Sequence, residues 1–245
     1  MPVIILIRKR IFLLSALFCC FVVGMAAVLW CGHTQAAPVF SVRDGVPVTV
    51  VVDAGHGGED GGAVSPDGVE ESHLNLAIAV QVNDLLRFAG QKTLLTRSED
   101  ITIADPDLTT IRQRKSSDLK NRVALVNSTE NAVLLSIHQN SLPSSTVTHG
   151  AQVFWNRQEG AEVLAEIIQD SLNSCINVGN EKLPKQIPST IYLMKSITAP
   201  GVIVECGFLS NPAETARLQQ PSYQLKLAAA IAAGYLRCAA GEEIT

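Results

Sequence analysis

The sequence predicts a single α/β domain with a mostly parallel central sheet flanked by helices. Three apolar runs, Val48–Val52, Ala132–Ile137 and Val202–Val204, have the composition of strands buried on both faces. Segments with helical spacing separate these runs, and strands that alternate with helices favour a parallel sheet. The chain has 245 residues, of which 47% are hydrophobic, so it can bury one sizeable core and form one domain of about 200 residues.

Residues 1–37 are predicted to be a signal peptide or membrane anchor with a linker, and residues 38–245 a catalytic domain. Arg8, Lys9 and Arg10 precede an uncharged run over residues 11–30, which is about long enough to span a bilayer. Small residues near Ala36 also suit a cleavage site, so both fates remain open. Either fate leaves the domain outside the cytoplasmic membrane.

Between the first and second apolar runs, side-chain spacing and chain breakers define the expected elements. The first is a helix over about 74–86, which Gly90 ends, and a strand over Lys92–Thr96 follows it. A polar connection over 98–116 then leads to a second helix. This helix is expected to be capped by Ser117 or Asp118, to end at about Asn127, and to have Leu119, Val123 and Val126 on its inward face.

The rest of the chain continues the alternation of strands and helices. The expected elements are a strand over Gly150–Trp155, a helix over Glu159–Asn173 with Val163, Ile167 and Leu172 inward, short strands over Ile191–Met194 and Gly201–Val204, a helix start at Asn211-Pro212, and a helix over about Ser222–Cys238.

Charge and cysteine content exclude several classes of protein. The formal net charge of −4 offers no basic surface for nucleic acid. Three of the six cysteines follow the N-terminal segment, and an odd number argues against a disulfide framework. One of them, Cys206, directly follows Glu205 and is an alternative nucleophile. Because strand neighbours point to opposite faces, we interpret Cys206 as a core residue.

Metal-type ligands follow three of the predicted strands. His56 lies in the glycine-rich stretch DAGHGG, His138 in SIHQNS and Glu205 in VIVECGF, while Glu71 lies between the first two. Ligands of open α/β sheets bind beyond the carboxyl ends of the strands, where these side chains can meet. Two imidazoles and one carboxylate are the set of a catalytic zinc site, and a further carboxylate can handle protons.

Structural alternatives exist for each of these residues. Either histidine can be bonded within a loop or the core, although the glycines around His56 clear space for a ligand. Glu205 at the end of a buried strand needs a task or a partner, and Arg97 or Arg122 is a candidate partner. Arg97 itself can bind a substrate carboxylate or a backbone carbonyl.

The chain resembles the zinc-dependent N-acetylmuramoyl-L-alanine amidases of bacterial cell walls over about residues 48–238. The resemblance rests on several blocks in the same order, which are Val50–Ala63, Gly68–Leu76, Leu94–Arg97, Leu134–Ser141, Gly150–Val153 and Pro200–Asn211. The block Arg114–Arg122, which contains KSSDLKNR, is similar to the germination-specific amidases of spore-forming bacteria.

The resemblance implies a role for each candidate residue. His56, Glu71 and His138 would bind zinc, and Glu205 would be the catalytic carboxylate. Glu71 rather than its neighbour Glu70 matches the ligand position of the family. His73 departs from the family, which commonly has an acidic residue there. Asn140, two residues beyond His138, is a candidate to hydrogen-bond the substrate or to form a turn.

The implied reaction is hydrolysis of the amide between the lactyl group of N-acetylmuramic acid and L-alanine in peptidoglycan. The resemblance to the germination-specific subgroup predicts that the protein acts on spore cortex, in the formation of muramic lactam. The expected location is outside the cytoplasmic membrane, in the cell wall or the forespore intermembrane space. Expected partners are peptidoglycan, the membrane if the N-terminal segment is retained, and an accessory activator of unknown identity. The alternatives are a zinc peptidase acting within the stem peptide and a non-catalytic wall-binding protein.

Overall fold

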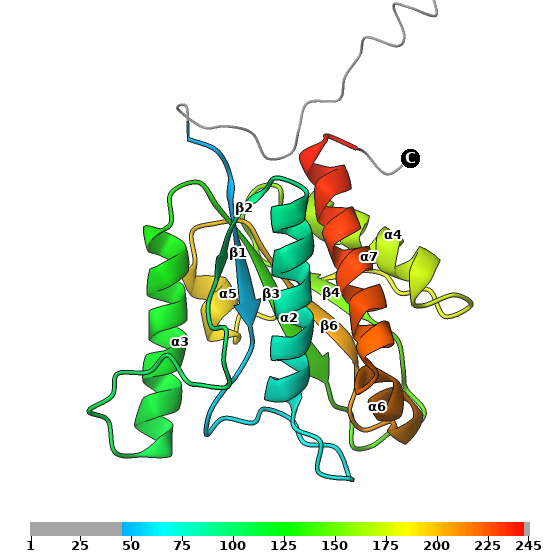
Figure 1. Ribbon diagram of the computed structural model, residues 1–245, viewed down its shortest axis with the longest axis horizontal. Helices are drawn as coiled ribbons and strands as arrows, with labels where there is room; N and C mark the ends of the chain where they lie inside the picture. Colours follow the sequence, from blue (N-terminus) through cyan, green and yellow to red (C-terminus); the bar gives the residue numbers. More distant parts are fainter. Residues whose placement is uncertain (1–45, 243–245) are drawn as a thin grey trace, which may run out of the picture. The chain divides into compact units, whose positions relative to one another are not determined.

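The computed structural model describes residues 46–242. Six strands of this part form one sheet in the order β2-β1-β3-β6-β4-β5 (Figure 1). The strands are β1 (Thr49–Ala54), β2 (Lys92–Leu95), β3 (Ala132–Asn140), β4 (Gln152–Trp155), β5 (Lys185–Gln186) and β6 (Gly201–Phe208). β2, β1, β3 and β6 are mutually parallel, whereas β4 runs antiparallel to β6. The predicted α/β class with a mostly parallel sheet is confirmed.

Helices cover both faces of the sheet. They are α2 (Glu71–Phe88), α3 (Ile111–Ser128), α4 (Ala161–Cys175), α5 (Tyr192–Ser196), α6 (Pro212–Leu218) and α7 (Pro221–Ala239). α2, α4 and α7 pack on one face, where they enclose the larger apolar cluster (Figure 1). α3 and α5 cover the other face over a smaller cluster.

Alternating side chains along the strands supply both apolar clusters. Val50 and Val52 of β1 belong to the larger cluster, whereas Val51 between them belongs to the smaller one. All three side chains are fully buried. This two-sided burial explains why β1 is a continuous apolar run in the sequence.

The helix before β3 begins earlier than the sequence suggested. α3 starts after Thr110, whose side chain forms a reciprocal capping box with Gln113. The predicted cap at Ser117 or Asp118 is therefore wrong, since both residues lie inside the helix. Leu119 is 40% exposed and does not face inward, while Val126 is buried as expected.

A second correction concerns Ile191–Met194, which was expected to be a strand. These residues belong to the short helix α5 and its N-cap Ile191. Leu193 and Met194 are buried in the smaller cluster, so the run is apolar because it packs under α3 rather than because it pairs in the sheet. A short apolar run does not distinguish a strand from a helix by its periodicity.

β3 and β6 also extend beyond their predicted ends. β3 continues from Ile137 to Asn140, and β6 from Val204 to Phe208. Other elements lie within a few residues of their predicted positions, and the helix start at Asn211-Pro212 is confirmed.

The predicted signal peptide or anchor, residues 1–37, lies outside the described residues, so its boundary with the catalytic domain stays a prediction. Among residues 46–242, no helix combines the length and apolar character needed to cross a membrane.

Candidate metal centre

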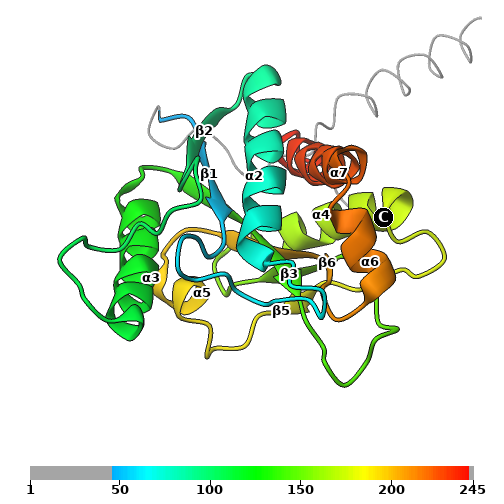
Figure 2. The same cartoon turned by 60° about the horizontal axis from the view of Figure 1, so that its bottom comes forward.

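The four candidate residues come from neighbouring elements at one edge of the sheet. His56 follows β1 by two residues, and Glu71 is the first residue of α2. His138 and Glu205 lie within β3 and β6, rather than beyond them, and are register partners. Figure 2 turns this edge toward the viewer, and the loop between β1 and α2 runs along it.

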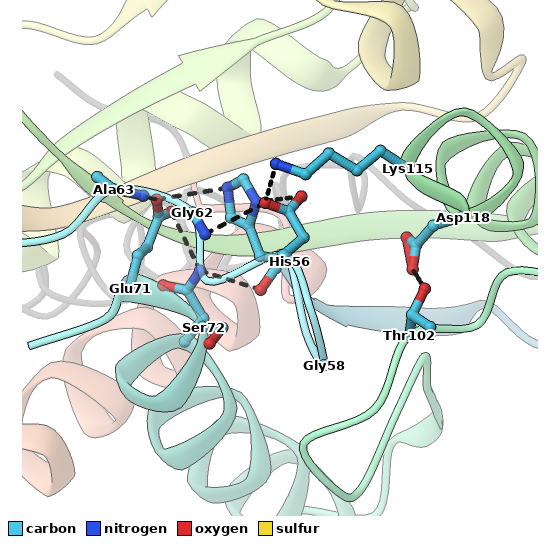
Figure 3. Close-up of polar contacts among 12 residues, drawn as sticks. His56, Gly58, Gly62, Ala63, Glu71, Ser72, Thr102, Lys115 and Asp118 are labelled. Carbon is cyan, nitrogen blue, oxygen red and sulfur yellow. Dashed lines mark hydrogen bonds and ion pairs between the residues drawn. The ribbon is translucent and has the colours of Figure 1, made fainter. Parts of the chain in front are cut away.

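His56, Glu71 and His138 form a compact group of metal-type ligands. One donor atom from each lies within 4.8 Å of the others. His56 Nε2 is 3.3 Å from Glu71 Oε2 (Figure 3). Two donors at about 2.0–2.1 Å from a tetrahedral zinc ion are separated by about 3.3 Å, so this separation fits a shared ion.

Each oxygen of the Glu71 carboxylate has a defined set of donors. Oε2 accepts from the Ala63 amide at 2.8 Å (Figure 3). Oε1 accepts from the Gln139 amide at 3.0 Å and the Asn75 side chain at 3.1 Å, and it contacts His138 Nδ1 at 2.8 Å. These contacts fix the rotamer of Glu71 before any ion binds.

The Glu71–His138 contact shifts both pKa values. Burial alone raises the pKa of Glu71, but the hydrogen bond and charge of His138 outweigh it and lower the pKa to about 2. Burial alone lowers the pKa of His138, but Glu71 outweighs it and raises the pKa to about 9. A metal ion must therefore displace a proton from this pair, which couples metal binding to pH.

Glycines leave the space that the three candidate ligands occupy. A Cβ atom on Gly55 would lie 2.3 Å from the His138 ring. A Cβ atom on Gly62 would lie 2.5 Å from Glu71 Oε2 and 2.8 Å from His56 Cδ2. The glycine-rich stretch is therefore required by the close approach of the ligands.

Two buried arginines hold the backbone that carries His56. Arg97 donates to the carbonyls of Ala54 and Gly55 at 3.0 Å each. Arg122 donates to the carbonyls of Ala54 at 2.8 Å and His56 at 2.7 Å. His56 has a positive φ of 61°, an unusual backbone conformation for a non-glycine residue that these bonds help to stabilise.

Arg122 also balances buried negative charge below the site. It pairs with Asp53 at the end of β1 and with Asp118 on α3. Burial alone raises the pKa of Asp53, but the Arg122 guanidinium and the hydroxyls of Ser136 and Thr96 outweigh it and lower the pKa. Arg97 and Arg122 are thus engaged with backbone and aspartates, and neither forms the ion pair with Glu205 that was considered from the sequence.

Glu205 is the register partner of His138, and one of its carboxylate oxygens has no hydrogen-bond partner among the described residues. Its Oε2 atom is buried and accepts no hydrogen bond within the described part of the chain, although the residue as a whole is partly exposed. Burial and the negative charge of Glu71 raise the pKa of Glu205, His138 and His56 lower it, and the result is about 7. A carboxyl group with this pKa can take up and release a proton near neutral pH.

Comparison with known proteins shows to which family this chain belongs. The family model described as N-acetylmuramoyl-L-alanine amidase matches residues 50–237. The chain belongs to this amidase family. The amidase therefore hydrolyses the amide between N-acetylmuramic acid and L-alanine in peptidoglycan, and the alternatives of a stem peptidase and a non-catalytic wall protein lose their support.

Two curated relatives cover most of the amidase. The germination-specific N-acetylmuramoyl-L-alanine amidase of Bacillus subtilis is 37% identical over 188 residues, which is 77% of this chain and 78% of that protein. The amidase AmiA of Escherichia coli is 28% identical, and the alignment covers 84% of this chain and 80% of that protein.

Two solved structures share the fold. The CwlD amidase of Clostridioides difficile, solved in complex with the GerS lipoprotein, is 34% identical with a TM-score of 0.74 and covers 78% of this chain and 97% of that one. An N-acetylmuramoyl-L-alanine amidase of Clostridium difficile 630 is 28% identical with a TM-score of 0.67 and covers 78% and 95%.

The other residues that were considered from the sequence lie outside the group of His56, Glu71 and His138. Asn140 is the last residue of β3, and its carbonyl accepts from the Leu209 amide at 2.8 Å. His73 pairs with Asp100, and His149 contacts the Val147 carbonyl. Burial raises the pKa of the Cys206 thiol, which agrees with a core residue and not with a thiolate nucleophile.

Sequence reasoning missed two residues that support His56. Asp60 contacts His56 Nδ1, and Lys115 contacts Asp60. Burial raises the pKa of Asp60, but His56 and Lys115 outweigh it and lower the pKa. The only sequence signal was an acidic residue four positions after His56 in the glycine-rich stretch. Lys115 carries no such signal, because it approaches from α3, more than fifty residues later.

Proposed function

We propose that the amidase is zinc-dependent, that His56, Glu71 and His138 bind the ion, and that Glu205 is the catalytic carboxylate. The observation that carries this proposal is the arrangement of three donor atoms within 4.8 Å of one another beside a carboxylate with a free, buried oxygen. Two histidines and one glutamate are a ligand set of catalytic zinc sites, in which the fourth position is left for water or substrate.

Zinc, when bound, supplies Lewis acidity that polarises an amide carbonyl and lowers the pKa of water. Glu205 accepts a proton from the attacking water and delivers it to the departing amine of L-alanine. Its pKa of about 7 suits both steps, because the same group must gain and lose a proton in each turnover. Asn140, at the end of β3 beside the ligands, is proposed to hydrogen-bond the substrate.

We further propose that the amidase acts on spore cortex. The 37% identity to the germination-specific amidase and the structural likeness to CwlD support this assignment. Hydrolysis frees the lactyl carboxyl group, and a second enzyme must then close the muramic lactam. The N-terminal segment, retained or cleaved, would deliver the domain outside the cytoplasmic membrane, in the cell wall or the forespore intermembrane space.

An accessory protein is a proposed partner of the amidase. CwlD was solved in complex with the GerS lipoprotein, and the chain is 34% identical to CwlD over 78% of its length. A protein held at the membrane surface is therefore a suitable class of partner for bringing the domain to nascent cortex.

Muropeptide analysis tests the reaction directly. Purified peptidoglycan treated with the full chain and zinc should release stem peptides with a free N-terminal L-alanine, and the glycan should retain intact lactyl groups. Products cut within the stem would instead indicate a peptidase.

Analysis of spores tests the cortex assignment separately. Cortex from cells that lack the protein should contain no muramic lactam, and the spores should fail to complete germination. Normal lactam content would rule out the cortex role and leave the amidase reaction unaffected.

A further inference from the structure

The carboxylate of Asp60 lies between a candidate ligand and a lysine. Its Oδ2 atom is 2.9 Å from His56 Nδ1, and its Oδ1 atom is 2.7 Å from Lys115 Nζ. Oδ1 also accepts from the Gly62 amide at 3.3 Å. Figure 3 shows Lys115 extending from α3 toward His56, with the contacts drawn as dashed lines. None of these interactions has a role in the reaction described above.

The contact with Asp60 determines which nitrogen of His56 can bind a metal. An ionised carboxylate only accepts hydrogen bonds, so His56 Nδ1 must carry the proton. When a metal ion is bound, Nε2 keeps its lone pair for the ion, and Nε2 is the nitrogen that lies 3.3 Å from Glu71 Oε2. The hydrogen bond also limits rotation of a ring that sits on a loop of glycines.

Lys115 restrains Asp60 from a different part of the chain. Asp60 belongs to the loop between β1 and α2, whereas Lys115 lies in the second turn of α3. The preceding residue, Arg114, pairs in the same way with Glu59. Two consecutive cations of α3 therefore bind two consecutive carboxylates of the loop, and only the Asp60–Lys115 pair continues to a candidate ligand.

We propose that Asp60 is a positioning residue that selects the Nε2-donor form of His56, and that Lys115 holds Asp60 in place for this task. The pair would thereby raise the affinity of the His56–Glu71–His138 group for zinc. This inference rests on the proposed metal site. A hydrogen-bonded partner of a ligating histidine typically contributes about 10–100-fold to metal affinity.

Zinc affinity of the full chain, measured by competition with a chromogenic chelator, tests the proposal without using activity. Asp60→Asn should weaken zinc binding by about 10-fold or more, and Lys115→Met should weaken it by a smaller factor. The matched controls are Glu59→Gln, which changes the neighbouring carboxylate, and Lys120→Met, which removes an exposed lysine of the same helix. Both controls should keep wild-type affinity.

The protonated nitrogen of His56 provides a second readout in the zinc-loaded chain. Long-range ¹H–¹⁵N correlation spectra should show the proton of the wild-type ring on Nδ1, with the His56 signals assigned by their loss in His56→Ala. In Asp60→Asn the Nδ1 proton should exchange faster with water, since the anionic acceptor is gone.

The outcomes separate this proposal from the metal site itself. Wild-type zinc affinity in Asp60→Asn, equal weakening in Glu59→Gln, or a wild-type ring protonated on Nε2 would each overturn the positioning role while leaving the metal site standing. A wild-type chain that binds no zinc would overturn the metal site and this proposal together.

Discussion

His138 and Glu205 lie opposite each other on the adjacent parallel strands β3 and β6. The alternation of each strand puts them on the same face of the sheet as Leu134 and Ile203, whose side chains belong to the smaller apolar cluster. The sheet register therefore sets the spacing between a candidate metal ligand and the candidate catalytic carboxylate. Both residues lie within strands, so neither depends on a loop for its place.

Replacing Glu205 by Gln should separate metal binding from catalysis. The amide keeps the size of the side chain but accepts no proton, so turnover should fall by roughly a hundredfold or more. Zinc content, measured by atomic emission on the purified protein, should stay at the wild-type level. Loss of the metal in this variant would instead make Glu205 a ligand.

The rate of the amidase should fall on the acid side of its pH profile. Glu205 must be ionised to accept a proton, and its pKa in the metal-free chain is about 7. A bound cation lowers this pKa, so the acid limb of kcat/KM should have an apparent pKa at or below about 7. The limb should be absent from the residual activity of Glu205→Gln, and an unchanged limb in that variant would assign it to another group.

Replacing His138 by Ala should remove both zinc and activity. The variant loses one of the three proposed protein ligands, and it also leaves Glu71 without its charged neighbour. His149→Ala is the matched control, because the His149 side chain contacts the carbonyl of Val147, two residues earlier, and belongs to no candidate metal group. Full zinc content in His138→Ala would sink the proposed ligand set.

Replacing Arg122 by Met should destabilise the fold rather than only the site. Removal of one partner from a buried ion pair leaves Asp53 uncompensated and costs about 3–5 kcal/mol. Urea denaturation should report this loss in the free energy of unfolding. Arg112→Met, an exposed position on the same helix, should stay close to wild type.

The loss of unfolding free energy in Arg122→Met should depend on pH in a defined direction. In the wild type the folded pKa of Asp53 is below its unfolded value, so the ion pair stabilises the protein above about pH 4 and this contribution is lost as the pH falls toward the folded pKa. Without Arg122, burial raises the folded pKa, and protonated Asp53 needs no partner. The difference in unfolding free energy between wild type and Arg122→Met should therefore shrink between pH 7 and pH 4; a difference that stays constant would contradict this account.

Strand-end motifs allowed most of the candidate site to be predicted. Three apolar runs predicted β1, β3 and β6, and the residues at or near their ends are His56, His138 and Glu205. The carboxyl ends of parallel strands meet at one edge of a sheet, so these side chains had to lie close together. The assignment of Glu71 depended on the family resemblance, because Glu70 next to it has the same chemistry.

Local pattern did not predict the features that depend on packing. The polar first turns of α3 carry no apolar stripe, and the helix begins there because Thr110 caps it. Ile191–Met194 is apolar to fit under α3, a contact with a helix more than sixty residues earlier in the chain. Propensity and periodicity describe neighbours in sequence, whereas these residues are determined by neighbours in space.

The sequence by itself determined the α/β class, the strands that carry the site and the residue types that gather there. Strands buried on two faces require apolar residues, and metal ligands require particular side chains, so both can be recognised in the sequence. Only the tertiary structure decided how the site is supported. Arg97 and Arg122 bind the carbonyls of the His56 loop, and Lys115 restrains Asp60 from α3. These contacts join segments that are tens of residues apart, and their strength depends on burial and distance, which exist only in the folded chain.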